Sequence, residues 1–205
     1  MEAGRSGFSP ERQPPSFYIN LFRVVRDFGR PLPRRLWIFS IRIAPAGVVI
    51  MRVCVQRVSR ASVALPDEND RIVGQIEKGF LVLLGVGRDD SEDDARYLAK
   101  KVAQLRVFDD GEGKMNLDVS KVDGRVLDVS QFTLYADCVK GNRPSFVAAA
   151  PPEQAVALYR FFVAELNERG VSTEEGVFQA NMSVSLVNDG PVTIWIDSKD
   201  RKNAQ

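Results

Sequence analysis

The sequence changes character at about residue 50, and this break limits how much of the chain can build a packed core. Residues 1–50 contain six prolines and no sustained periodicity, whereas residues 51–205 alternate apolar and polar positions from their first residues. The second part has 155 residues, which is the length of a single domain. The sequence therefore predicts an N-terminal extension over 1–50 and one domain over 51–205.

The predicted extension differs from the domain in charge as well as in pattern. Residues 1–50 hold eight arginines, no lysine and three acidic residues, a net charge of +5, while residues 51–205 carry −4. An arginine-rich, acid-poor segment is typical of an organelle transit peptide, although this one has few serines. The alternatives are a disordered, non-essential extension or a translation start at Met51. We favour these alternatives, because composition alone identifies a targeting segment poorly.

The chain contains no histidine, which excludes several kinds of chemistry. A Ser-His-Asp triad, a Cys-His couple and a histidine-ligated zinc all need an imidazole. The two cysteines, Cys54 and Cys138, cannot build a disulfide framework and point to a reducing, cytoplasmic location. No apolar run reaches the length that a membrane-spanning helix needs. We expect an enzyme of this composition to work without a metal or another cofactor and away from membranes.

Seven apolar or alternating segments after the break predict strands. They cover residues 51–58, 61–65, 71–76, 79–86, 125–134, 182–187 and 192–197. A Pro-Asp-Glu-Asn-Asp cluster separates the second from the third, which is typical of a hairpin. The run over 79–86 is continuously apolar and bounded by glycine, as in a fully buried strand.

Two helices are predicted between these strands. Ser91 and Asp94 form a capping box ahead of apolar residues at helical spacing that continue to Leu105. A second helix begins at Pro152, a favoured first-turn residue, and stops at Gly170. Because strands outnumber helices and do not alternate with them regularly, the sequence predicts an α+β fold with a largely antiparallel sheet or open barrel.

Two short segments have unusual composition. Ser130–Leu134 places polar side chains beside phenylalanine at the end of a predicted strand, and residues 188–193 read Asn-Asp-Gly-Pro-Val-Thr. A Gly-Pro pair in a tight connection is a candidate for a cis peptide bond, because proline weakens the preference for trans. The alternatives are a half-exposed strand end and a plain hairpin turn with a trans proline.

Taken together and in this order, these segments resemble the D-aminoacyl-tRNA deacylase (D-tyrosyl-tRNA deacylase) family. The resemblance is carried by Met51–Val58, Ser130–Leu134, Lys140–Phe146 and Met182–Thr193. It does not cover residues 1–50, and Gln179-Ala180-Asn181 departs from the small residue or aspartate that many relatives carry before the methionine. The resemblance implies a compact β-rich fold, a homodimer with its active sites at the subunit interface, and hydrolysis of the ester between a D-amino acid and the 3′-terminal adenosine of tRNA.

The resemblance also implies roles for individual residues. The Gly190-Pro191 pair is expected to be cis and to enter the pocket of the partner subunit, supported by Arg57. Phe178 and Met182 are expected to line the adenosine side of the pocket. The catalytic segment is expected to be Ser130, Gln131, Phe132 and Thr133.

A chain without histidine can still hydrolyse such an ester, because the ester is already labile. Backbone N–H groups of Phe132 and Thr133 would stabilise the oxyanion, and the neighbouring ribose 2′-hydroxyl would activate a water. Thr133 as a covalent nucleophile is the rival, but it would need an adjacent base; we therefore give it a positioning role. Main-chain carbonyls of Gly190 and Pro191 would collide with an L side chain and tolerate hydrogen, so glycyl-tRNA is expected as a second substrate.

The negative charge of the domain counts against an extensive RNA footprint, because phosphate neutralisation needs clustered lysine and arginine. We expect contact with the terminal nucleotide, with Lys140 and Arg143 near a phosphate; a solvated loop is the alternative for both. A non-catalytic nucleic-acid-binding module is the competing class of function. A thiol esterase built on Cys138 would lack a cationic neighbour for the thiolate.

Overall fold

A computed structural model describes residues 50–203 of the chain. The strands are β1 (Arg52–Leu65), β2 (Arg71–Ile76), β3 (Gly79–Gly85), β4 (Phe108–Asp109), β5 (Met115–Leu117), β6 (Arg125–Ser130), β7 (Thr173–Glu175) and β8 (Ser183–Asp197). The helices are α1 (Glu92–Ala103) and α2 (Pro152–Glu168), and the 3₁₀ turns are η1 (Pro66–Glu68), η2 (Val119–Val122), η3 (Phe132–Tyr135) and η4 (Ser198–Asn203). The extension predicted over residues 1–50 lies outside the described residues, apart from Ile50.

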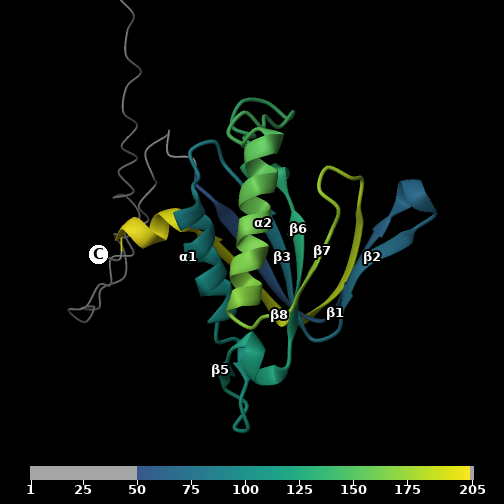
Figure 1. The fold of residues 1–205 in the computed structure, drawn as a ribbon, viewed down its shortest axis with the longest axis vertical. Helices are drawn as coiled ribbons and strands as arrows, with labels where there is room; N and C mark the ends of the chain where they lie inside the picture. The colour runs from purple at the N-terminus through teal and green to yellow at the C-terminus, as the bar shows by residue number, and fades with distance from the viewer. Residues whose placement is uncertain (1–49, 204–205) are drawn as a thin grey trace, which may run out of the picture. The chain divides into compact units, whose positions relative to one another are not determined.

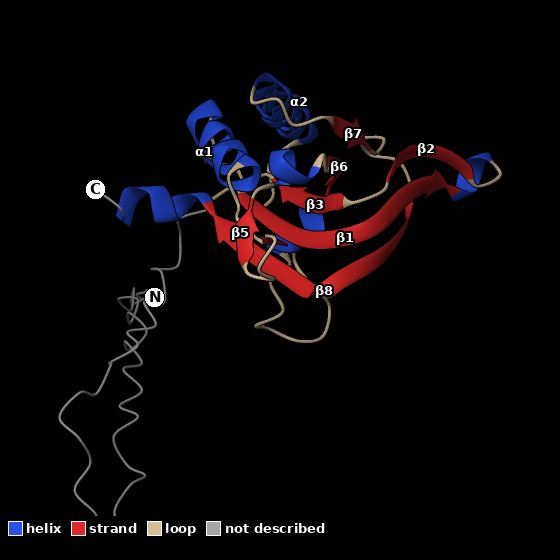
Figure 2. Cartoon of the chain, turned by 90° about the horizontal axis from the view of Figure 1, so that it is seen from below, coloured by secondary structure: helices blue, strands red, loops and turns tan. Residues whose placement is uncertain are grey.

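Strand β1 is the centre of a six-stranded sheet and pairs antiparallel with three other strands (Figure 2). Its first half pairs with β3 and its last residues pair with β2, while β8 follows its opposite edge. Beyond β3 the sheet continues through β6 and β7 in parallel register. The predicted α+β fold is therefore confirmed, with a parallel extension on one side of an antiparallel sheet.

Both helices cover the same face of the sheet (Figures 1 and 2). The larger core cluster lies between that face and the helices, and it includes the fully buried side chains of Val53, Phe80, Leu98 and Phe162. A second cluster, which includes Val63, Leu81 and Leu127, lies on the other face. Alternation of side chains along a strand explains the division, since neighbouring residues of one strand enter different clusters.

The two helices begin and end close to the predicted positions. Ser91 donates to the Asp94 carboxylate from its backbone N–H at 3.0 Å and from its hydroxyl at 2.8 Å, so the predicted capping box holds the start of α1. Helix α1 ends at Ala103, before Leu105. After α2 the chain turns at Gly170, whose φ of +79° lies in the left-handed region that favours glycine.

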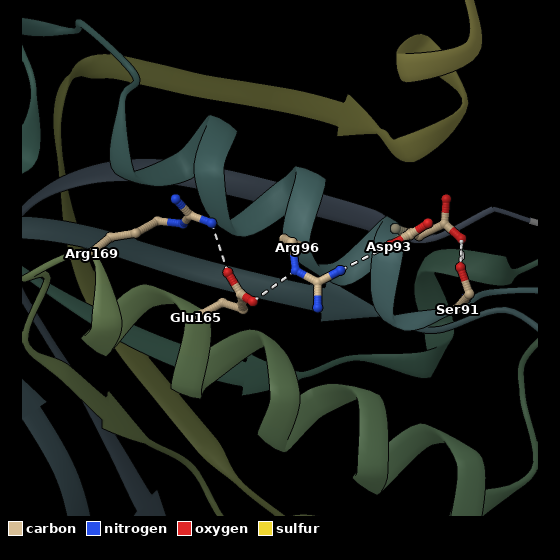
Figure 3. A network of polar contacts seen from close by, with 6 residues as sticks. Ser91, Asp93, Arg96, Glu165 and Arg169 are labelled. Carbon is tan, nitrogen blue, oxygen red and sulfur yellow. Dashed lines mark hydrogen bonds and ion pairs between the residues drawn. The ribbon is translucent and has the colours of Figure 1, made fainter.

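An ion-pair network joins the two helices (Figure 3). Glu165 on α2 is 8% exposed and accepts a hydrogen bond from Nε of Arg96 on α1 at 3.0 Å. Its second carboxylate oxygen accepts from Arg169 at 2.7 Å, and Arg96 also contacts Asp93 at 2.9 Å. A buried carboxylate between two guanidinium groups therefore fixes one helix against the other.

Two predicted divisions of the sheet are wrong. The segments 51–58 and 61–65 form one continuous strand, β1, because β8 pairs along nearly its whole length and bridges the polar residues between them. The segments 182–187 and 192–197 are likewise one strand, β8, and both pair with β1 in the same direction. Residues 189–192 are therefore not a hairpin turn. They are extra residues that leave the register between Asn188 and Thr193.

Candidate active site

The segment Ser130–Leu134 leaves the sheet instead of extending it. Strand β6 ends at Ser130, and the N–H of Gln131 donates to the Leu84 carbonyl at 2.7 Å, which ties the end of β6 to β3. The chain then forms the single 3₁₀ turn η3. The sequence predicted a strand through Leu134; this is wrong because the residues after Gln131 form a turn at the strand end, and of its apolar residues Phe132 lines a cavity.

A pocket of about 630 Å³ opens beside this turn. Five predicted site residues line it together: Ser130, Gln131, Phe132, Phe178 and Met182. Strand β6 and η3 supply the first three, and the segment between β7 and β8 supplies the last two. The remaining lining residues are Val86, Val129, Phe146, Ala149, Ala150, Pro152, Ala155, Gln179, Ala180, Asn181 and Val184. The pocket thus combines an apolar wall with a few backbone and side-chain polar groups, as small-molecule sites do.

Aromatic rings stand on two sides of the pocket. Phe132 is 57% exposed and meets Phe146 edge to face, with ring centroids 5.1 Å apart and an interplanar angle of 72°. Phe178 lies 6.3 Å from the ring of Tyr159, which belongs to α2. Phe146 was not predicted as a site residue, although it ends the Lys140–Phe146 segment that carried part of the resemblance. An exposed phenylalanine at a pocket offers a surface on which a base or an apolar side chain can stack.

The turn η3 leaves polar groups at the edge of the pocket. The Gln131 N–H donates to Leu84 on β3, and the N–H groups of Leu134 and Ala136 donate to the carbonyls of Gln131 and Thr133 within the turn. Among residues 50–203 no acceptor is found for the N–H groups of Phe132 and Thr133. The Thr133 hydroxyl accepts a hydrogen bond from the Gln131 side-chain amide, and Thr133 does not itself line the pocket.

The Gly190–Pro191 peptide bond is cis, as the resemblance implied. Asn188 closes the bulge that contains it, since its side-chain oxygen accepts from the Val192 N–H at 2.8 Å. Gly190 has a φ of +128°, and a Cβ atom there would lie 2.8 Å from Cγ2 of Val192. Neither Gly190 nor Pro191 lines the pocket of its own chain.

Arg57 contacts this bulge from β1. Its Nε donates to the Asp189 carbonyl at 3.0 Å and lies 3.3 Å from the Asp189 carboxylate. A second nitrogen donates to the Val107 carbonyl and lies 3.8 Å from Asp109. The side chain is 7% exposed, so its guanidinium is held from several sides. The expected contact between Arg57 and the Gly-Pro segment is present.

Lys140 and Arg143 lie apart from the pocket lining. Both are exposed in the loop between η3 and α2, which is closed by a backbone bridge between Asp137 and Ser145. Cys138 is exposed in the same loop and does not line the pocket. The structure thus brings five predicted residues together in the pocket and Arg57 together with the Gly190-Pro191 bulge, and it leaves Lys140 and Arg143 outside both groups.

Buried acids near the pocket are the groups that sequence reasoning missed. Burial raises the pKa of Asp128 well above its usual range, and Glu175 beside it raises it further. Burial also raises the pKa of the Tyr159 hydroxyl, which donates to the Asp128 carbonyl at 3.0 Å. A single acid inside the otherwise apolar strand Arg125–Ser130 was the available signal. Asp90, in the connection between β3 and α1, is a second buried acid, and burial raises its pKa to about 7.

A metal site and a membrane-spanning helix are both absent from the part of the chain that the structure describes. No group of three or more histidine, cysteine, aspartate or glutamate side chains in residues 50–203 is arranged to hold a metal ion. Within the same residues, no helix has the length and apolar character to cross a membrane.

Comparisons with known proteins find one family. A family model described as D-Tyr-tRNA(Tyr) deacylase matches residues 54–197. A protein of Koribacter versatilis named D-aminoacyl-tRNA deacylase is 62% identical over 149 residues, which are 73% of this chain and 98% of that protein. Among solved structures, the c-Myc DNA Unwinding Element Binding Protein is 38% identical with a TM-score of 0.65, covering 71% of this chain and 97% of that one. A probable eukaryotic D-amino acid tRNA deacylase shares the fold at 18% identity, with a TM-score of 0.62 and coverages of 72% and 98%.

Proposed function

The chain belongs to the D-Tyr-tRNA(Tyr) deacylase family, and on this basis we propose how its pocket hydrolyses the ester bond of D-aminoacyl-tRNA. The enzyme is a D-aminoacyl-tRNA deacylase, a hydrolase of translation quality control that releases a free D-amino acid and tRNA. The observation that carries the proposal is the turn η3, which brings Phe132 and unpaired backbone N–H groups to the edge of the pocket.

The oxyanion of the reaction is stabilised by main-chain donors. The N–H groups of Phe132 and Thr133 have no acceptor within residues 50–203 and lie on a turn anchored at both ends. Donors that are fixed before the reaction need no reorganisation when charge develops, and removing one costs about 10²–10³ in rate in other enzymes. Ser130 and Gln131 complete the catalytic segment, with Gln131 orienting the Thr133 hydroxyl.

The water is activated by the substrate itself. The chain has no histidine, and Thr133 bonds to an amide, which is not a base that could deprotonate it. The 2′-hydroxyl of the terminal ribose stands next to the scissile ester, so it is positioned to orient or deprotonate a water. The protein then contributes position and oxyanion stabilisation, which suffices for an ester that is already activated.

Selection by handedness is assigned to the bulge of a partner subunit. Gly190 and Pro191 present main-chain carbonyls and do not line the pocket of their own chain, which supports their insertion into the pocket of a second copy in a homodimer. Carbonyls aimed at Cα would accept hydrogen and collide with an L side chain. The same geometry does not exclude glycine, so glycyl-tRNA is a second substrate.

The terminal adenosine occupies the side of the pocket that Phe178 and Met182 line. Stacking on such a surface holds a base without charge. Lys140 and Arg143 are exposed outside the pocket, where they can meet a phosphate of the acceptor end. The reaction uses no cofactor. We place it in the cytoplasm, and we treat residues 1–50 as a non-essential extension of the deacylase domain over 51–205.

The test compares amino-acid release from D-aminoacyl-, L-aminoacyl- and glycyl-tRNA by the full chain. We expect the D and glycyl esters to be cleaved and the L ester to survive. Gly190→Ala is expected to impair the preference, because its Cβ would meet Val192 Cγ2 at 2.8 Å and Arg57 at 3.1 Å. Gly113→Ala is the matched control, since Gly113 also has a positive φ but no atom lies within 4 Å of its Cβ position. Comparable cleavage of the L ester by the unmodified protein would refute rejection by handedness.

A second function is favoured by one comparison. The solved relative at 38% identity is named for binding a DNA unwinding element, so a non-catalytic nucleic-acid-binding role on the same scaffold is the alternative. Hydrolysis separates the two. A binding module would retain D-aminoacyl-tRNA without releasing the amino acid, whereas the deacylase releases it at substoichiometric enzyme.

A further inference from the structure

The hydroxyl of Tyr135, the last residue of η3, lies within hydrogen-bonding distance of more acceptors than it can donate to. It contacts the carbonyl of Ile50, the carbonyl of Gly85 at 3.4 Å and a carboxylate oxygen of Asp90 at 3.3 Å. A neutral phenol carries one proton and donates one full hydrogen bond. The Tyr135 side chain is buried, and burial raises its pKa, so it stays neutral. One proton is therefore shared among three acceptors.

Asp90 is the acceptor whose charge can change. It is 8% exposed in the connection between β3 and α1, and its carboxylate accepts from the Gly87 N–H at 2.5 Å. It forms no ion pair with any residue in the described part of the chain. Burial raises its pKa to about 7, while hydrogen bonds from Gly87, Tyr135 and Met51 lower it. Both charge states are therefore populated near neutral pH.

The charged groups around Asp90 come from three other elements. Asp94 on α1 repels its negative charge. Arg52 on β1 lies with its guanidinium carbon 4.6 Å from the Tyr135 ring centroid, and it is paired with Asp197 on β8 at 3.3 Å. Since Arg52 is already paired, Asp90 ionises without a cation of its own.

Asp90 and Tyr135 contact two elements that border the pocket, since Tyr135 belongs to η3 and the Asp90 backbone is hydrogen-bonded to α2. Arg52 donates to the Leu134 carbonyl at 3.1 Å, and a Cβ at Gly85 would lie 3.0 Å from the Tyr135 ring, so the end of η3 is closely packed. The Gln154 side chain on α2 donates to the Asp90 carbonyl at 3.2 Å, close to Pro152, which lines the pocket. A shift of Tyr135 therefore moves the turn that carries Phe132.

We propose that Asp90 is a positioning residue for the deacylase reaction, and that its charge selects the acceptor of the Tyr135 proton. When Asp90 is neutral, Tyr135 donates to the Ile50 carbonyl and the carboxyl hydrogen can bond to the Tyr135 oxygen, which fixes η3. When Asp90 is ionised it has no proton to donate, so the Tyr135 hydroxyl keeps one hydrogen bond in place of two and η3 loosens. This inference rests on the proposed function for its effect on rate, but its effect on η3 does not.

The decisive variant is Asp90→Asn, because an amide has the shape of the carboxyl, stays neutral at every pH and keeps a hydrogen to donate to Tyr135. We measure kcat and KM for D-aminoacyl-tRNA between pH 6 and 8. We expect the ratio of the kcat of the unmodified protein to the kcat of Asp90→Asn to fall by about fivefold from pH 6 to pH 8. This is the factor expected for one hydrogen bond. The KM should change little. Asp89→Asn, an exposed neighbour, should track the unmodified protein. When Tyr135→Phe is already present, adding Asp90→Asn should no longer change the pH profile.

A second measurement works without substrate. Hydrogen–deuterium exchange of the peptide over residues 131–136 is compared between the unmodified protein and Asp90→Asn at the same pH. We expect equal protection at pH 6 and lower protection in the unmodified protein at pH 8. Equal protection at both pH values would overturn the inference, whatever the activity. Absence of hydrolysis together with the expected exchange difference would overturn the proposed function and leave the effect of Asp90 on η3 standing.

Discussion

Asp128 shows how a single buried acid makes stability depend on pH. Its side chain is fully buried on β6, and neither carboxylate oxygen finds a hydrogen-bond partner within residues 50–203. Burial raises its pKa well above the usual value, which means that the folded state keeps the proton while the unfolded chain releases it. The contribution of Asp128 to stability is therefore complete below about pH 4, and this contribution is lost as the pH rises through the pKa of the folded state.

Asp128→Asn is expected to remove this loss. Relative to the unmodified protein, the variant should gain up to about 1 kcal/mol of unfolding free energy per pH unit above about pH 4, because an amide does not ionise. Urea unfolding at several pH values measures the difference. Asp118→Asn is the control with the opposite sign, since hydrogen bonds from Ser120 lower the pKa of Asp118. A constant difference between Asp128→Asn and the unmodified protein across pH would contradict the assignment.

Arg57 is a residue whose shape matters as much as its charge. Its guanidinium reaches the carbonyls of Asp189 and Val107 at once, which a lysine ammonium on a single flexible stem cannot copy. Arg57→Lys is therefore expected to cost about 1–3 kcal/mol of stability and to relax the preference for D over L esters. Urea unfolding and the three-substrate release assay measure these effects. Arg60→Lys, an exposed position on the same strand, should leave both unchanged.

Elements differ in how far the sequence determines them. Helix α1 was predictable because the Ser91–Asp94 capping box is a local signal that fixes its start. Strand β8 was not, because its continuity through residues 189–192 depends on pairing with β1, which is more than a hundred residues away in the sequence. The end of β6 was missed for a similar reason. Leu134 is apolar whether the chain extends or turns, and contacts with β3, at Leu84 and Gly85, lie far from this segment in the sequence.

The sequence predicted the site residues that lie inside recognisable motifs and missed those that lie outside them. Residues inside the segments that carried the resemblance, such as Phe132 and Met182, reach the pocket. Asp90 and Tyr135 were not identified, because their importance depends on burial and on a shared proton, which no spacing in the sequence records.

The contact between α1 and α2 gives a prediction about a whole element. Glu165 accepts from Arg96 and Arg169 and is nearly buried, so Glu165→Gln should cost about 1 kcal/mol of unfolding free energy by removing the charge between two cations. Glu112→Gln is the matched control, because Glu112 pairs with Lys114 at a fully exposed position, where such a change should stay within about 0.5 kcal/mol. Urea unfolding at low and high salt measures both. An equal cost for the two variants would show that the network adds nothing to helix packing.

The molecule as a whole separates the two halves of the proposed site. The pocket is lined by the end of β6, the start of α2 and residues 178–184, which reach the first residues of β8, whereas the Gly-Pro bulge lies further along β8 and does not line the pocket. In a single chain, the bulge that we propose selects the substrate does not line the pocket that we propose binds it. Two copies related by a twofold axis would supply both halves twice, as symmetric dimers do.

Subunit complementation tests this arrangement directly. Phe132→Ala damages the pocket and Gly190→Ala damages the bulge, so each homodimer carries two defective sites. In a mixed dimer one site would receive both defects and the other neither, if the pocket and the bulge of each site come from different chains. Refolding an equal mixture should then halve cleavage of the L ester relative to the mean of the two separate homodimers, because only a quarter of the sites, in place of half, still combine an intact pocket with a damaged bulge, and another quarter are intact. If pocket and bulge of one chain formed a site together, mixing would leave cleavage of the L ester at that mean.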